Sequence, residues 1–341
     1  MLLDGLFAAV PTCFYPDERL NLPKLEANLA RYSRTQLSGV LVLGSNGEAS
    51  LLDDEEMRQV IRKAGEVTST EKLLVAGLPR EGLRANLALA QVAYEAGFDA
   101  VLARAPYYYR AQMTPLAVRN YFSTLADRSP LPVILYHIPQ SVGFEFPVEL
   151  VTELAGHPNI IGIKDSSGSV ERIAATVAAT RNSPQRMVTV TPHFTAISRR
   201  QLKAQSGNLL GVASLAGGSV SPLKTRTRAV GFEVVTGGAH LLLPALEAGA
   251  VGGMLGMASF APEACQEIYL AWRDHDQKLA ELKQQRVVAA NRRIVAELGA
   301  SGLKYACDFN GFYGGPARLP LLPLKADEKA EVEALLSGMR S

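Results

Sequence analysis

The sequence predicts a (β/α)8 barrel, the TIM-barrel fold of the α/β class. Short apolar runs recur eight times in about 250 residues, and helical patterns lie between them. The runs are continuous rather than alternating, which is typical of parallel strands buried on both faces. A doubly wound open sheet is the alternative, but eight units without an obvious reversal point favour closure.

The predicted strands and helices alternate along the chain. The strands are Leu6–Val10, Val40–Leu43, Leu73–Ala76, Ala100–Ala103, Pro132–Tyr136, Ile160–Ile163, Phe232–Val235 and Ala250–Leu255. The helices are Leu22–Leu37, Asp53–Val67, Leu83–Ala96, Leu116–Ala126, Pro147–Leu154, Val170–Thr180 and Leu241–Ala248. Local signals agree with these limits, because acidic residues open the second helix and Gly97 follows the third.

Further helical patterns follow the eighth strand, at Pro262–Asp274, Asp276–Leu298 and Ala326–Leu336. We expect residues 1–260 to form the barrel and residues 261–341 to form a C-terminal helical extension packed on it. The segment Asn310–Pro316 is predicted to be a turn within that extension.

One connection is too long for a simple barrel. The starts of strands six and seven lie about 70 residues apart, against about 18 to 34 elsewhere, and the excess falls near residues 184–229. From Asn182 to Phe232 there are seven Lys or Arg and no Asp or Glu, so the rest of the chain carries +2 − 7 = −5. We expect a surface insertion without a catalytic role. A lid, a subunit contact or an anion-binding element is the alternative.

Composition excludes several classes of protein. The net charge of +2 does not favour a nucleic-acid or membrane partner, and no apolar run reaches eighteen residues. The first residues lack the basic segment of a signal peptide. Three widely spaced cysteines show neither metal-ligand spacing nor a disulfide framework. We therefore expect a reduced, cytoplasmic protein without a metal site.

Lys164 is the most informative residue, because it ends the apolar run Ile160–Ile163. Chemistry in a barrel of this kind sits at the C-terminal ends of the strands. Burial there favours a neutral amine, and a neutral amine can attack a ketone to form a Schiff base. A lysine that merely ends a strand and reaches toward water is the alternative.

Two other strand ends carry polar groups. Tyr136 ends the fifth run, where its hydroxyl can face the barrel mouth and serve in proton transfer, although a core aromatic is the alternative. His137 then points to the other side of the strand and is expected to be structural or peripheral. The second run leads into Gly44–Glu48, a glycine-rich turn whose backbone N–H groups, Ser45 hydroxyl and Asn46 amide suit a small carboxylate. A polar turn that only leads into the helix at Asp53 is the alternative. An amine, a phenol and a carboxylate-sized turn together indicate a Schiff-base site for a 2-keto acid.

These motifs resemble those of one known family. Gly44–Glu48, Tyr136–Pro139 and Gly162–Asp165 are similar in order and spacing to the motifs of the dihydrodipicolinate synthase and N-acetylneuraminate lyase family of class I aldolases. Ala8–Phe14 resembles the family's first strand. The resemblance covers residues 1–181 and 232–325, and we expect the intervening 50 residues to lie outside it.

The resemblance implies a role for each matching position. Lys164 would form the Schiff base with pyruvate, and Tyr136 would be the general acid and base. Ser45 would link Tyr136 to Tyr108, which would reach into the site of a neighbouring subunit. The family is usually a tetramer built as a dimer of dimers, so a homo-oligomer is expected.

The resemblance also implies how substrate would be held. Ser45, Asn46 and Gly47 would bind the pyruvate carboxylate, and the backbone carbonyl of Met254 would lie near the imine. No metal or cofactor would be needed, because the protonated imine acts as the electron sink.

Two departures from the family pattern bear on the substrate. Ser141 stands where the dihydrodipicolinate synthases carry an arginine that grips the carboxylate of aspartate semialdehyde. Ser45-Asn46 replaces the usual Thr-Thr or Ser-Thr, as in 4-hydroxy-2-oxoglutarate aldolases and fungal 2-keto-3-deoxy-L-galactonate aldolases. Gly302–Lys304 and Tyr313–Arg318 resemble the 4-hydroxy-2-oxoglutarate aldolases most closely.

The resemblance thus implies an aldolase that cleaves 4-hydroxy-2-oxoglutarate, or a related 4-hydroxy-2-keto acid, to pyruvate and an aldehyde such as glyoxylate. Condensation of pyruvate with aspartate semialdehyde, the dihydrodipicolinate synthase reaction, is the first alternative. A non-catalytic binding protein on the same scaffold is the second, and the presence of Lys164, Tyr136 and Ser45 argues against it.

Overall fold

The computed structural model describes residues 1–193, 195–209 and 224–339. Within these residues, eight parallel strands close into a barrel, as predicted. The strands are, in the order in which they pair around the barrel, β1 (Gly5–Ala9), β2 (Gly39–Val42), β3 (Leu73–Leu78), β4 (Ala100–Arg104), β5 (Val133–His137), β6 (Ile160–Asp165), β9 (Glu233–Thr236) and β10 (Gly252–Leu255). β10 pairs with β1 in parallel, which closes the ring.

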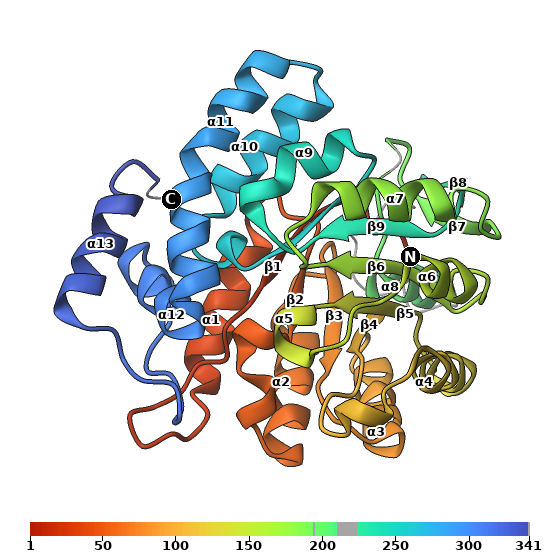
Figure 1. Cartoon of the computed structure of the whole chain (residues 1–341), viewed down its shortest axis with the longest axis horizontal. Coiled ribbons are helices and arrows are strands. Elements are labelled where there is room, and N and C mark those ends of the chain that lie inside the picture. The colour runs from red at the N-terminus through yellow and green to blue at the C-terminus, as the bar shows by residue number, and fades with distance from the viewer. Residues whose placement is uncertain (194, 210–223, 340–341) are drawn as a thin grey trace.

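Helices surround the strands (Figure 1). They are α1 (Leu22–Ser33), α2 (Asp54–Val67), α3 (Leu83–Glu95), α4 (Pro115–Arg128), the short α5 (Pro139–Val142), α6 (Val148–Leu154), α7 (Val170–Thr180), α9 (Leu242–Glu247) and α10 (Pro262–Arg273). The sequence explains where α2 starts, because Asp53 and Glu56 form a reciprocal capping box there. In the described part of the chain, no helix is long and apolar enough to cross a membrane.

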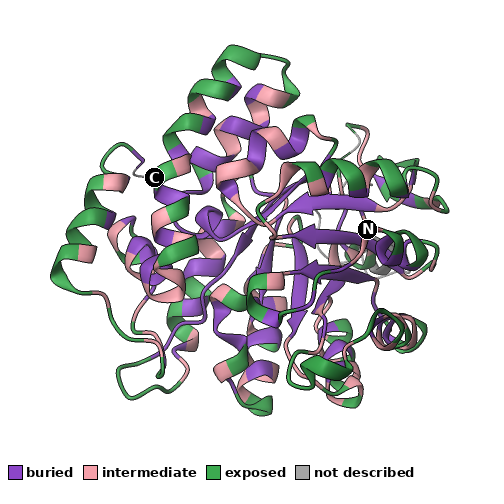
Figure 2. Cartoon of the chain, viewed as in Figure 1, coloured by how far each residue is buried: buried purple, intermediate pink, exposed green. Residues whose placement is uncertain are grey.

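The core has two layers, because side chains of a strand alternate between its two faces. Residues such as Phe7, Leu102 and Ile134 fill the inside of the barrel. A larger set packs between the outside of the barrel and the helices. Figure 2 shows the strands as almost entirely buried and the outer helix faces as exposed. The inward positions at the C-terminal strand ends are therefore the ones that can form a site.

The C-terminal part contains one helix that the sequence did not predict. After α11 (Gln277–Ala290) and a π-helical segment at Asn291–Glu297, the chain forms α12 (Gly299–Phe309), and α13 (Ala326–Leu336) follows. Gly299 and Gly302 disfavour a helix by propensity. Packing overrides that preference, because a Cβ on Gly302 would lie 2.6 Å from the Ile294 carbonyl oxygen. Helix α12 therefore approaches its neighbours more closely than a side chain would permit.

The insertion has structure of its own, with an antiparallel pair β7 (Arg186–Val190) and β8 (Arg226–Val230) and a helix α8 (Arg199–Leu209). Residue 194 and residues 210–223, which include the Gly217-Gly218 pair and Pro222, lie outside the described residues.

The described part of the insertion lies on the N-terminal face of the barrel. Arg186 donates to the Met1 carbonyl (3.2 Å) and pairs with Glu233 (2.8 Å), the first residue of β9. In Figure 1, β7 and β8 lie on the side where β5 and β6 start, away from their arrowheads. The described residues of the insertion therefore do not form a lid over the C-terminal strand ends. The chain topology explains this position. The insertion lies in the connection from α7 to β9, and a connection from a helix to the next parallel strand returns to the face of the barrel on which strands begin.

Candidate active site

Three inward-pointing side chains lie side by side at the C-terminal ends of β4, β5 and β6. Arg104 pairs with Tyr136 in the strand register, and Tyr136 pairs with Lys164. Lys164 is 4% exposed, and its Nζ lies 4.4 Å from the centroid of the Tyr136 ring. This is within the range of a cation–π contact. The structure therefore brings the two main predicted residues together.

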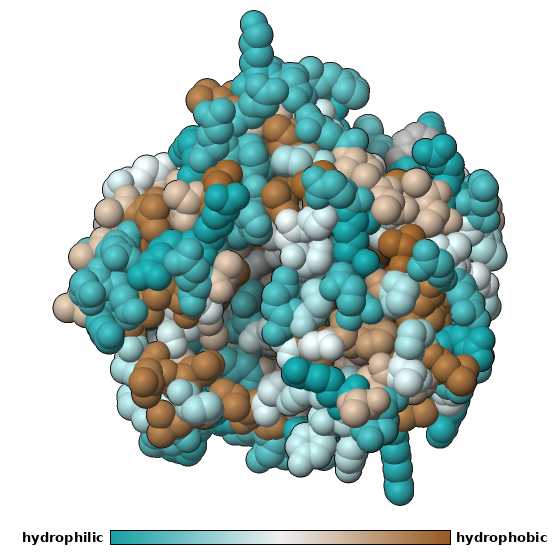
Figure 3. Space-filling view, viewed as in Figure 1, coloured by the Kyte–Doolittle hydropathy of each residue, from teal (hydrophilic) through white to brown (hydrophobic). Residues whose placement is uncertain are grey.

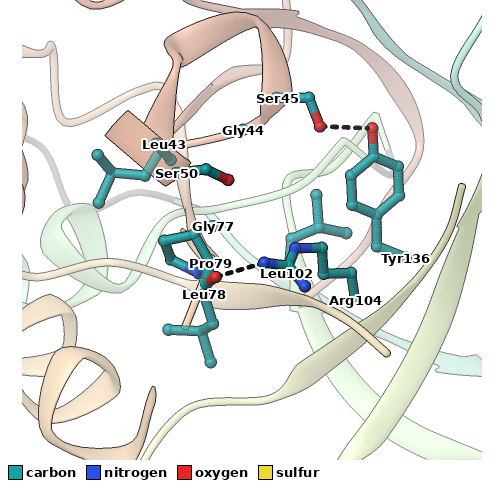
Figure 4. A pocket seen from close by; sticks show the side chains of 11 residues that line it. Leu43, Gly44, Ser45, Ser50, Gly77, Leu78, Pro79, Leu102, Arg104 and Tyr136 are labelled. Atoms are coloured by element: carbon teal, nitrogen blue, oxygen red, sulfur yellow. Dashed lines mark hydrogen bonds between the residues drawn. The ribbon is translucent and has the colours of Figure 1, made fainter. Parts of the chain in front are cut away.

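Tyr136 also contacts the loop after β2. Its hydroxyl lies 3.4 Å from the Ser45 Oγ, at the long end of hydrogen-bond distances (Figure 4). Both residues line a pocket of about 320 Å³, part of it open to solvent, between the ends of β2, β3, β4 and β5. The space-filling view is hollowed near its centre, where the arrowheads of β5 and β6 end in Figure 1 (Figure 3).

A strained backbone holds the Ser45 loop in place. Leu43, directly after β2, has φ of 58°, which is uncommon for a side chain other than glycine. Its carbonyl oxygen lies against β3, where a Cβ on Gly77 would come within 2.0 Å of it. Gly77 is thus required for the chain to turn at Leu43 and present Ser45 to the pocket. Residues Ser45–Gly47 then form a single 3-10 turn.

Glu48 anchors the other end of this loop to the C-terminal helices. It has φ of 53°, and its buried carboxylate lies 2.5 Å from the Nζ of Lys304 on α12. Lys304 also donates to the Pro316 carbonyl (2.7 Å), and the Arg318 N–H donates to Glu48 (2.8 Å). Burial lowers the pKa of Lys304, and the nearby Glu48 charge opposes that effect. The Gly302–Lys304 motif therefore supports the loop from outside the barrel.

Asn46 and Gly47 are in the loop but differ in setting. Asn46 is half-buried and packs against Gly256, where a Cβ would come within 2.5 Å of the Asn46 amide nitrogen. Gly47 is buried, and its carbonyl accepts from the Thr12 hydroxyl at 2.6 Å. The loop is thus fixed on both sides of Ser45, which is itself exposed.

The remaining predicted residues lie farther from the pocket or face away from it. Met254 is buried inside the barrel on β10, in register with Phe7. Tyr108 is 75% exposed and packs edge-on against Tyr109, so it does not reach Ser45 within this chain. His137 is fully buried on the outer side of β5, as expected from the alternation, and burial lowers its pKa.

Asp165 fixes the strand end next to Lys164. Its carboxylate accepts from the Ser167 N–H (2.8 Å) and hydroxyl (2.6 Å) and from the Nε of Arg172 (3.1 Å). Because neighbouring residues of a strand move together, these contacts on the outer face restrain Lys164 on the inner face. These contacts hold the Asp165 side chain at the end of β6.

Arg104 is a pocket residue that the sequence analysis did not select. It is the single charged residue among those that line the pocket, and it lies between Tyr136 and Pro79 (Figure 4). The alternation of side chains along a strand predicts that Arg104 points inward, because it lies two positions after the inward-pointing Leu102.

Comparison with known proteins identifies the family of the chain. The family model of the Dihydrodipicolinate synthetase family matches residues 2–186 and 194–339. The chain belongs to this family. The match resumes at residue 194, so it reaches farther into the insertion than the expected limits of 181 and 232.

Members of the dihydrodipicolinate synthetase family align along nearly the whole chain. The 4-hydroxy-tetrahydrodipicolinate synthase of Acidiphilium cryptum is 28% identical over 99% of both chains. The L-threo-3-deoxy-hexylosonate aldolase of Hypocrea jecorina is 28% identical over 98% of this chain and 95% of its own. The chain is accordingly a carbon–carbon lyase of the class I aldolase type.

Solved structures show the same fold. The prophage protein YagE of E. coli K12, of the dihydrodipicolinic acid synthase family and solved in complex with pyruvate, superposes with a TM-score of 0.80, 24% identity and 99% coverage of both chains. The dihydrodipicolinate synthase of Acinetobacter baumannii, also complexed with pyruvate, has a TM-score of 0.80, 23% identity and 98% coverage of both chains.

Proposed function

We propose that this lyase forms a Schiff base between Lys164 and pyruvate, and that it cleaves 4-hydroxy-2-oxoglutarate to pyruvate and glyoxylate. The observation that carries the proposal is the buried Lys164 amine against the Tyr136 ring, with the Tyr136 hydroxyl 3.4 Å from Ser45. Lys164 would supply the nucleophile, and Tyr136 with Ser45 would supply a proton relay, at the C-terminal ends of neighbouring strands. Pyruvate bound in two solved relatives supports the choice of keto acid.

The proposed reaction needs no redox partner. The Lys164 amine attacks the C2 ketone, and loss of water gives a protonated imine. Tyr136 takes the proton of the C4 hydroxyl, and the electron pair of the C3–C4 bond moves toward the iminium nitrogen. The aldehyde leaves, the resulting enamine is protonated at C3, and water releases pyruvate and restores the amine. Ser45 would relay the proton to and from Tyr136.

The loop after β2 would hold the carboxylate next to the ketone. Ser45, Asn46 and Gly47 form one 3-10 turn, in which the Gly47 N–H donates to the Gly44 carbonyl at 3.0 Å. The N–H groups of Ser45 and Asn46, at the start of the turn, would therefore be the ones that meet the anion. The carbonyl of Met254, on β10, which is separated from β6 only by β9, would lie near the imine.

The choice of substrate rests on Ser141, which lies on α5 beside the C-terminal end of β5. A serine gives no bidentate charge pair to the carboxylate of aspartate semialdehyde. The synthase reaction remains the alternative, because most relatives, such as the one from Acidiphilium cryptum, carry the 4-hydroxy-tetrahydrodipicolinate synthase name. The aldolase of Hypocrea jecorina supports a cleavage reaction on a 3-deoxy keto acid.

We further propose that the chain works as a homo-oligomer, in which Tyr108 completes the site of a neighbouring subunit. Its 75% exposure next to the exposed Tyr109 supports this role. Sedimentation velocity of the wild type and of Tyr108→Phe tests it. A monomer that is fully active would contradict it.

The decisive experiment is pyruvate release from 4-hydroxy-2-oxoglutarate, with Lys164→Ala as the control. Borohydride reduction in the presence of pyruvate should add one reduced pyruvyl group to Lys164, as mass spectrometry of the peptide would show. Release by the wild type alone supports both the lysine and the substrate. An adduct without release would keep the Schiff base and transfer the assignment to aspartate semialdehyde or a longer keto acid. An active protein without any adduct would refute the mechanism.

A further inference from the structure

Arg104 lies at the mouth of the barrel, in the wall of the pocket. It is 11% exposed at its side chain and pairs with Glu81 at 2.9 Å. Tyr107 covers one face of the guanidinium, with the carbon atom Cζ 4.4 Å from the ring centroid. These contacts hold the head group rigidly at the wall of the pocket that Ser45 and Tyr136 also line. A fixed guanidinium binds an anion at a lower entropic cost than a mobile one.

The Arg104 guanidinium has N–H donors that its contacts within the described residues do not use. Nη1 donates to the Glu81 carboxylate (2.9 Å) and the Ala105 carbonyl (3.3 Å), and Nη2 donates to the Pro79 carbonyl (2.6 Å). Arginine has five N–H groups, so among the described residues two of them, including Nε–H, have no acceptor. Two adjacent N–H groups on one guanidinium match a carboxylate in bidentate geometry.

Its distance from Lys164 fits a short substrate. Arg104 and Lys164 flank Tyr136 in the same register, so their Cα atoms are two strand spacings, about 10 Å, apart. Both side chains point inward from these positions. A keto acid held as an imine on Lys164 could therefore extend past Tyr136 and place a distal carboxylate at Arg104.

We propose that Arg104 is the specificity-determining residue for the second substrate, and that it selects an aldehyde carrying a carboxylate on or near the carbonyl carbon. This rests on the proposed Schiff-base reaction at Lys164. Glu81 then has a tuning role, because its carboxylate neutralises part of the Arg104 charge while it accepts the N–H groups of Tyr107 (2.7 Å) and Tyr108 (3.0 Å).

The test compares two two-carbon aldehydes, anionic glyoxylate and neutral glycolaldehyde, as partners for pyruvate. The readout is the ratio of their kcat/KM values, with borohydride trapping of pyruvate as a measure of an intact site. Arg104→Leu should lower the ratio about 10- to 100-fold through its effect on glyoxylate alone, since a lost hydrogen bond to a charged group has that size. Arg104→Lys should lower it less. Glu81→Gln should raise it.

Arg80→Leu is the matched control. Arg80 lies in the loop after β3 but pairs with Asp54 and the Leu52 carbonyl, away from the residues that line the pocket. The Arg80→Leu variant should have the same ratio of kcat/KM values for glyoxylate and glycolaldehyde as the wild type. An unchanged ratio in Arg104→Leu would overturn the proposal, as would a parallel loss of both aldehydes and of trapping, which would mean a structural role.

Failure of the Schiff-base proposal is recognised separately, because the wild type itself would then trap no pyruvate. In that case calorimetric titration with malonate, which forms no imine, tests Arg104 directly. Binding that weakens about 10-fold or more in Arg104→Leu supports the anion site. Equal affinity in the two proteins would overturn it.

Discussion

The Lys304 ammonium lies 2.5 Å from the Glu48 carboxylate, and both side chains are buried. One comes from helix α12 and the other from the loop that carries Ser45. This ion pair and its backbone contacts therefore join helix α12 to the loop of the candidate site. Any change at this pair is expected to affect both the stability of the fold and the position of Ser45.

Removing one member of this pair should be more damaging than removing both. Lys304→Met leaves the Glu48 charge buried and alone, so we expect a loss of about 3–5 kcal/mol in the free energy of unfolding. Adding Glu48→Gln in a double variant should recover part of that loss. Urea denaturation of the two single variants and the double variant measures the coupling. Strictly additive losses would show that the two groups do not interact.

Tyr136→Phe should separate imine formation from bond cleavage. Without the hydroxyl, we expect kcat for cleavage to fall about 10²- to 10⁴-fold, the usual size of a general acid–base contribution, while borohydride still traps pyruvate on Lys164. Tyr121→Phe is the matched control, because the Tyr121 hydroxyl accepts from Asn86 among the outer helices. Loss of trapping in Tyr136→Phe would instead assign Tyr136 to imine formation.

Ser45→Ala should have a smaller effect on cleavage than Tyr136→Phe. The 3.4 Å separation from the Tyr136 hydroxyl is long for a hydrogen bond, so we expect a loss of about 10-fold in kcat. Ser45→Thr retains a hydroxyl at the same position and should recover most of the rate. Equal rates for Ser45→Ala and the wild type would remove Ser45 from the proton relay.

The insertion should matter for stability and not for catalysis. Arg200 on α8 donates to the Gly65 and Thr68 carbonyls at the end of α2 (3.2 and 2.6 Å) and to those of Ser69 and Lys72 (2.9 and 2.8 Å). A cation at a helix C-terminus is also favoured by the helix dipole. We expect Arg200→Ala to lower the unfolding free energy by about 2–4 kcal/mol and leave kcat/KM within about 2-fold.

The exposed Lys203 on the same helix provides the control, and Lys203→Ala should change neither quantity. Thermal or urea unfolding and steady-state kinetics on the same preparations give the answer. A loss of activity in Arg200→Ala at a temperature where it remains folded would contradict the separation of the two faces.

Glu233 should make the stability of the protein depend on pH. Burial raises its pKa to about 7, against the opposing effect of Arg186. The folded protein therefore holds a proton that the unfolded chain has already released above pH 4.5, and stability is lost as the pH rises toward and through 7. Relative to Glu233→Gln, the wild type should lose about 2 kcal/mol between pH 5 and pH 8. Parallel stability curves for the two proteins would refute this.

The sequence was sufficient for the barrel because each strand was a short apolar run between turn signals. It was insufficient for α12, where Gly299 and Gly302 lower helix propensity and only packing against Ile294 explains the helix. It also gave no indication of the Leu43 backbone conformation, which depends on Gly77 in the neighbouring strand.

The candidate site was predictable only where a residue ends a strand. Lys164 and Tyr136 could be selected in this way, and the structure places them in contact. Arg104 also ends a strand, and the same alternation would have identified it. The pairing of Glu48 with Lys304 could not be predicted, because nothing local in either segment indicates a partner so far away in the sequence.

The position of the described part of the insertion indicates where the barrel tolerates added sequence. It enters the barrel where a helix returns to the start of β9, on the face opposite Lys164 and Tyr136. Residues inserted there must form hydrogen bonds to the backbone carbonyls of the barrel and bury their own apolar side chains. Residues inserted beside the pocket must in addition leave the catalytic geometry unchanged. The barrel thus offers a natural attachment point at which a binding module or a reporter could be joined without rebuilding the chemistry at its other end.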